Sequence, residues 1–68
     1  MIICTTYRRA RMLAEAFVLT EHKDCAVLDL GRRKYGVAAK EILTLEQLAT
    51  AAVIVTVESL RKYIGGGR

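Results

Sequence analysis

Three apolar, β-favouring runs, each ending at a break that is followed by a basic cluster, constrain most strongly what this chain can fold into. The runs are residues 2–6, 26–31 and 53–57. A strong helical pattern over 7–21 separates the first two, and a shorter one over 45–51 precedes the third. Strands that alternate with helices are typical of a small layered α/β domain. We therefore expect about three mainly parallel strands alternating with helices.

The helix predicted over 7–21 carries two apolar stripes. Thr6 is placed to cap its first turn. The stripe expected to face the sheet, at helical spacing, consists of Ala10, Leu13, Ala14, Phe17 and Val18. The second stripe consists of Met12, Ala16 and Leu19. Because a helix with so narrow a polar strip is normally covered on more than one side, we expect the second stripe to contact another molecule.

The segment 35–42 is ambiguous, and it leaves an alternative fold open. It either continues as a loop or pairs back on the preceding strand, which would give an α+β fold with a hairpin over 25–39. Further on, Thr44 and Gln47 have the spacing of a capping box, which predicts a helix from Leu45. A last helix is expected over 58–64, closed by Gly65. A single domain over 1–64 with a flexible glycine-rich tail over 65–68 follows from this division.

Composition favours self-association. The chain has 68 residues, of which 53% are hydrophobic, and its mean hydropathy is +0.25. A domain of this size buries only about 60% of the surface that its unfolded chain exposes. Small scaffolds usually need a staple or an assembly, and no staple is evident. We therefore expect a homo-oligomer, or a protein partner that covers the remaining apolar surface.

The two cysteines do not suggest a disulfide or a metal site. Cys4 falls late in the first predicted strand and Cys25 early in the second, so parallel neighbours would hold them at different heights. One histidine and no CxxC motif give a zinc site almost no support. The longest uncharged stretch, 47–57, is too short to span a bilayer. These features predict a cytoplasmic protein with buried free thiols and no membrane contact.

The basic clusters are the main candidate site. They hold seven of the eleven Lys and Arg residues, and each cluster includes a tyrosine. If the three strands are parallel, their carboxyl ends and these clusters share one edge, where open α/β sheets bind ligands. The residues expected to bind an anion are Arg8, Arg9, Arg32, Arg33, Lys34, Arg61 and Lys62, with Tyr7, Tyr35 and Tyr63. The alternative is a solvated rim that keeps the protein in solution.

No motif predicts catalysis or a cofactor. The spacing of Gly31 and Gly36 matches a phosphate-binding loop, but Val37 and Ala38 stand where that loop needs Lys and Ser or Thr. A net charge of +4 and a pI of about 9.4 favour an acidic partner. We therefore expect a small non-enzymatic module that binds a polyanion such as nucleic acid. The alternative is an adaptor or inhibitor, of the kind found among phage and mobile-element accessory proteins, that docks on a protein through its first helix.

Overall fold

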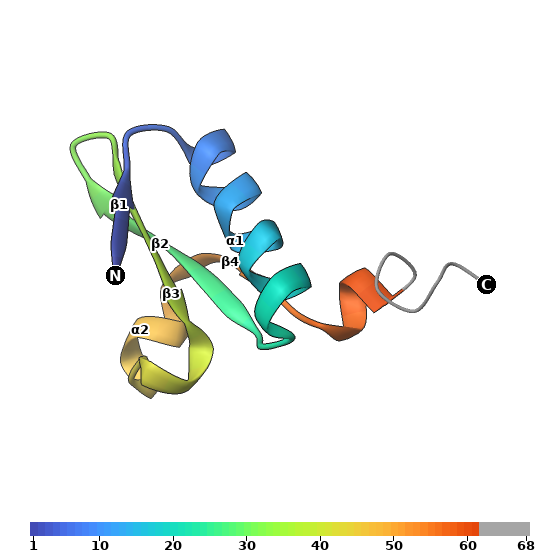
Figure 1. Ribbon diagram of the computed structural model, residues 1–68. Coiled ribbons are helices and arrows are strands. Elements are labelled where there is room, and N and C mark those ends of the chain that lie inside the picture. Colours follow the sequence, from blue (N-terminus) through green and yellow to red (C-terminus); the bar gives the residue numbers. More distant parts are fainter. Residues whose placement is uncertain (62–68) are drawn as a thin grey trace.

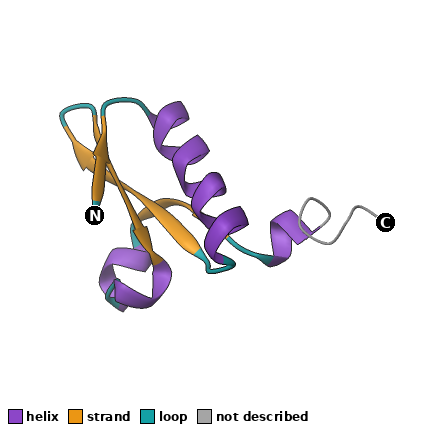
Figure 2. Cartoon of the chain, viewed as in Figure 1, coloured by secondary structure: helices purple, strands orange, loops and turns teal. Residues whose placement is uncertain are grey.

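The protein has an α+β fold in which one long helix lies against a four-stranded antiparallel sheet (Figures 1 and 2). The computed structural model describes residues 1–61. The strands lie in the order β1-β3-β2-β4. The elements are β1 (Ile2–Cys4), α1 (Tyr7–Glu21), β2 (Cys25–Gly31), β3 (Lys34–Ala39), α2 (Leu45–Ala49) and β4 (Ala51–Val55), with short 3₁₀ turns η1 (Lys40–Ile42) and η2 (Glu58–Leu60).

The mainly parallel sheet expected from the alternation of strands and helices is wrong. Residues 25–39 form the hairpin that was the alternative, with β3 antiparallel to both β2 and β1. The two residues between β2 and β3 turn the chain back at once, whereas a parallel neighbour needs a connection of a dozen or more residues. After η1 and α2, the chain forms β4, which pairs antiparallel with β2. β1 and β2 run in the same direction with β3 between them, and β3 and β4 run in the opposite direction.

The main core lies between α1 and one face of the sheet. The helix places small side chains against the strands, and Ala10, Ala14 and Val18 are completely buried. This close contact covers Val27 and Val37 in the two central strands. The larger Leu13 and Phe17 lie at the margin of the core, where they are partly buried. The first apolar stripe of the helix therefore faces the sheet, as its spacing predicts.

The opposite face of the sheet is only partly covered. Ala26, Leu28 and Ala38 are buried there, and α2 lies on that side of the sheet in Figure 1. Near the hairpin, the side chain of Met1 lies over Gly36, where an added Cβ would meet its sulfur. Leu30, farther along β2, is 47% exposed, so the cover of this face is incomplete.

Local capping confirms the two predicted helix starts. The Thr6 hydroxyl accepts a hydrogen bond from the amide of Arg9 at 3.2 Å. Thr44 and Gln47 form both bonds of a capping box, although α2 ends at Ala49, two residues before the predicted end. The expected strand over 53–57 begins earlier and is β4, because Ala51 already pairs with Leu28.

The described start of the helix predicted over 58–64 differs from an α-helix. Residues 58–60 form a 3₁₀ turn, and the rest of the helix predicted over 58–64 lies mostly outside the described residues. The glycine-rich tail over 65–68 lies outside them altogether. Val57, just before η2, donates its amide to the Asp24 carboxylate at 2.9 Å. That bond fastens the end of the described chain to the loop between α1 and β2.

Both cysteines are buried and free, as predicted. Cys4 pairs with Tyr35 and Cys25 with Ala39, so the two thiols lie four residues apart along β3. That register separates them by roughly 13 Å along the strand, at about 3.3 Å per residue, which is too far for a disulfide. Among residues 1–61, no helix has the length and apolar character that crossing a lipid bilayer requires.

Candidate functional site

Two of the three basic clusters meet at one end of the sheet. Because β1 and β2 run in the same direction, their carboxyl ends lie at the same end, with the start of β3 between them. The β1–α1 connection and the β2–β3 turn lie next to each other there (Figure 1). We call this region the basic end, and its cations are Arg8, Arg9, Arg32, Arg33 and Lys34. All five side chains are exposed.

The first pair of cations lies on the opening turn of α1. A helix leaves its first amides without partners inside the helix, and its dipole places partial positive charge at this end. The Thr6 hydroxyl satisfies the amide of Arg9, and the first turn contains no acidic residue. Arg8 and Arg9 therefore add full positive charge to a helix end that is already electropositive.

The second pair of cations forms the tip of the β2–β3 hairpin. Gly31 pairs with Lys34, so Arg32 and Arg33 make up a two-residue loop. Their φ angles are 53° and 61°, as a type I′ turn requires at both central positions. Asn-Gly is the preferred pair in such a turn, because left-handed backbone is unfavourable for residues such as arginine. The hairpin thus places two arginines where the backbone does not favour them.

The carboxylate at the basic end is held by the backbone. The Asp29 side chain accepts a hydrogen bond from the amide of Gly31 at 2.9 Å, which supports the approach to the turn. The three ion pairs among residues 1–61 lie elsewhere and are Arg11–Glu15, Lys23–Glu41 and Arg61–Glu58. No cation of the basic end has an ion-pair partner within the described chain. Its positive charge is therefore available to a ligand.

The tyrosines of the two converging clusters contact each other. The rings of Tyr7 and Tyr35 have centroids 6.0 Å apart and an interplanar angle of 69°, an edge-to-face arrangement. Tyr35 is half-buried and packs against the main core, while Tyr7 is 37% exposed. The pair joins the start of α1 to β3 and so holds the two clusters together. Tyr63 lies outside the described residues.

The third cluster does not join the other two. The strand before it, β4, is antiparallel to β2, so its carboxyl end lies at the opposite end of the sheet. Arg61 follows η2 there and forms an ion pair of 3.0 Å with Glu58. The expectation of one edge shared by all three clusters depended on parallel strands and is therefore wrong for Arg61. Lys62 lies outside the described residues.

The second stripe of α1 remains on the outer surface of the molecule. Met12 is 63% exposed, Leu19 is 39% exposed, and Ala16 is also exposed. Met12 and Ala16 line an open groove between α1 and β1, at the edge of the sheet where Ile2 is half-exposed.

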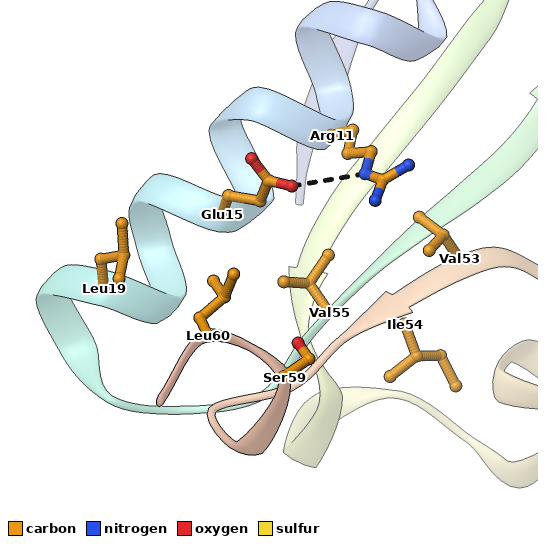
Figure 3. A pocket seen from close by; sticks show the side chains of 8 residues that line it. All are labelled: Arg11, Glu15, Leu19, Val53, Ile54, Val55, Ser59 and Leu60. Atoms are coloured by element: carbon orange, nitrogen blue, oxygen red, sulfur yellow. Dashed lines mark hydrogen bonds and ion pairs between the residues drawn. The ribbon is translucent and has the colours of Figure 1, made fainter. Parts of the chain in front are cut away.

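Leu19 lines a different groove, between α1 and β4 (Figure 3). The Arg11–Glu15 ion pair, with a nitrogen-to-oxygen distance of 3.3 Å, lies on the helix side of this groove. The rest is lined by Val53, Ile54 and Val55 of β4 and by Ser59 and Leu60 of η2. The three residues expected to form one interface are thus divided between two grooves.

The candidate metal ligands of the described residues are dispersed. Within residues 1–61, no three His, Cys, Asp or Glu side chains gather as metal ligands would. Asp29 lies late in β2 and Glu58 follows β4, which is antiparallel to β2, so the two carboxylates lie toward opposite ends of the sheet. Burial raises the pKa of the Cys25 thiol above its ordinary value, and the thiol lies 3.1 Å from the carbonyl oxygen of Ala38. A thiol held in its protonated form is a packing group rather than a nucleophile.

The left-handed turn is the feature of the site that sequence reasoning missed. Gly31 and the two arginines stand between apolar runs at the spacing of a two-residue hairpin loop. That signal was present, but arginine is not a residue that indicates a type I′ turn.

No protein-family model matches the chain, and neither a curated protein nor a solved structure is significantly similar to it.

Proposed function

We propose that this protein is a small non-enzymatic binding module whose basic end binds a polyanion, with nucleic acid as the ligand class. The observation that supports the proposal is the convergence of five exposed cations, without ion-pair partners in the described chain, from two different elements. Guanidinium groups and a helix amino terminus both suit phosphate. Phosphate contacts give affinity and fix orientation without selecting a base sequence.

Charge-neutralising variants test this proposal. One variant combines Arg8→Gln with Arg9→Gln, and a second combines Arg32→Gln with Arg33→Gln. The control combines Lys40→Gln with Arg61→Gln, which removes the same charge from the opposite end of the sheet. Binding is followed by fluorescence anisotropy with a labelled duplex and a labelled single strand at several salt concentrations.

We expect each basic-end variant to lower the salt slope by roughly 0.9 per lost contact on a duplex, or about 0.7 on a single strand. The control variant should change binding far less. If all three variants lose affinity equally, binding depends on net charge alone and the basic end is not the site. If the wild-type protein binds neither probe at low salt, the polyanion proposal is wrong.

A second candidate function is docking on a protein through the outer surface of α1, including association with a second copy. The exposure of Met12 and Leu19, in a chain with so little core, favours it. Met12→Glu should weaken such association, whereas Glu21→Gln, at an exposed position of the same helix outside both grooves, should not. Sedimentation velocity at micromolar concentration provides the readout. A wild-type protein that sediments as a monomer of about 7.6 kDa would exclude self-association.

A further inference from the structure

We propose that the ligand of the basic end is double-stranded DNA, with the Arg32–Arg33 tip entering the minor groove while the start of α1 lies on the flanking phosphates. This inference rests on the proposed polyanion function and specifies its ligand. It is drawn from the aromatic packing, the covering of the hairpin and the backbone conformation of its tip.

The packing of the aromatic rings favours a duplex over a single strand. Proteins that bind single strands stack the bases on exposed aromatic rings. Within residues 1–61 the aromatic side chains are Tyr7, Phe17 and Tyr35. Phe17 and Tyr35 pack against the core, and Tyr7 makes an edge-to-face contact with Tyr35. Within the described chain, the basic end therefore presents one partly exposed aromatic residue, Tyr7 at 37% exposure, beside its cations, rather than the several free rings of a stacking platform.

The elements around the hairpin allow only its tip to enter a groove. A bare two-stranded ribbon fits the major groove, which is about 12 Å wide. Here β1 flanks β3, and α1 covers one face of the ribbon. A helix alone has a diameter of about 10–12 Å with its side chains, so the helix and sheet together exceed the width of the major groove. The pairing of β4 with β2 stops at Leu28, which leaves the last part of β2 and the turn free on that side.

The conformation of the tip suits a role for the arginines themselves. Three successive residues, Gly31, Arg32 and Arg33, have positive φ angles of 81°, 53° and 61°. Residues other than glycine rarely adopt such angles, and strained backbone tends to occur at functional sites. Single arginine side chains enter the minor groove, where narrow A·T-rich segments have the most negative potential. Two adjacent arginines at a protruding turn match that mode of binding.

The start of α1 is placed to contact the phosphates that flank a minor groove occupied by the two arginines. Proteins that insert arginine into the minor groove often hold the adjacent phosphates with helix amino termini and main-chain amides. Arg8 and Arg9 lie in the first turn of α1, at the same end of the sheet as the turn. The Tyr7–Tyr35 contact fixes that helix end relative to β3.

The experiment compares three labelled probes of equal length: an A·T-rich duplex, a G·C-rich duplex and a single strand. Netropsin, which occupies the minor groove of A·T-rich DNA, serves as competitor. The tip variant combines Arg32→Asn with Arg33→Gly, which removes the charge and suits the turn. A second variant, Arg32→Lys with Arg33→Lys, keeps the charge but removes the guanidinium groups. The control combines Lys40→Gln with Arg61→Gln.

We expect the wild-type protein to bind the A·T-rich duplex most tightly and netropsin to displace it. The Asn-Gly variant should lose about tenfold or more in affinity for that duplex, together with the preference for it. The lysine variant should keep most of the salt slope but lose the preference, because lysine acts as a point charge. The control should retain the preference.

Equal binding to all three probes, insensitive to netropsin, would overturn the minor-groove inference and leave the polyanion function standing. Tighter binding to the single strand would overturn it as well. A failure to bind any probe would instead refute the proposed function on which the inference depends.

Discussion

Replacing Arg32 and Arg33 by Asn and Gly should stabilise the fold even though it removes two candidate ligand-binding side chains. Left-handed backbone costs an L-residue about 1–2 kcal/mol. Both arginines have positive φ, at 53° and 61°. Glycine removes that cost at the second position and asparagine reduces it at the first.

The size of the expected stabilisation also depends on an entropy change in the unfolded chain that opposes it. Glycine makes the unfolded chain more flexible, which offsets about 0.5–1 kcal/mol of the gain. A net stabilisation of about 1 kcal/mol remains, which corresponds to a rise in Tm of about 4–8 °C for a domain of this size. Thermal unfolding followed by circular dichroism at moderate salt measures it. Moderate salt reduces the contribution from relieved charge repulsion at the exposed turn.

A matched variant separates backbone strain from charge. Arg32→Asn combined with Arg33→Ala removes the same charge but keeps a Cβ at a φ of 61°. We expect it to be less stable than the Asn-Gly variant. Equal Tm values for the two variants, or an Asn-Gly variant less stable than the wild type, would refute the reasoning from strain.

Three further predictions concern the scaffold. Thr44→Ala removes the hydroxyl that accepts the Gln47 amide in the capping box, and it should destabilise the protein by about 0.5–2 kcal/mol in urea unfolding. An unchanged unfolding midpoint would mean that the cap of α2 contributes nothing to stability. Asp24→Ala removes the carboxylate that accepts the amide of Val57 and should cost about 1.5–3 kcal/mol, with a smaller loss for Asp24→Asn, measured by the same method. Burial raises the pKa of the Cys25 thiol, so the thiol of the unfolded chain loses its proton first as the pH rises. The free energy of unfolding should therefore fall as the pH rises past the ordinary thiol pKa of 9.0, and Cys25→Ala should make that fall less steep. Identical pH profiles for the wild type and the variant would contradict a raised pKa at Cys25.

The helices could be predicted because their signals are local. The Thr6 cap and the spacing of small apolar residues define α1, and the Thr44–Gln47 pair defines the start of α2. Each signal depends on side chains within one or two turns of backbone, and such contacts form in almost any surrounding fold. The turn between β2 and β3 is also local, but its arginines do not indicate a left-handed conformation.

The direction of β4 could not be predicted from its composition. A continuously apolar run such as 53–57 is typical of a central parallel strand that is covered on both faces. Here β4 is an edge strand, and Ile54 is 38% exposed. Direction and neighbour depend on contacts between distant residues, such as the pairing of Ala51 with Leu28. The same error placed Arg61 with the other clusters, whereas the β1 and β2 clusters meet because those two strands do run in the same direction.

The most direct test of the polyanion function is the salt dependence of wild-type binding to a labelled duplex. Five cations at the basic end, each in contact with one phosphate, predict that log K falls with log salt concentration with a slope of roughly −4.5, at about 0.9 per contact. Neutralising Arg32 and Arg33 should reduce that slope by about 1.8. An undetectable affinity at low salt, or a slope that the loss of both arginines leaves unchanged, would contradict the assignment of the basic end as the binding site.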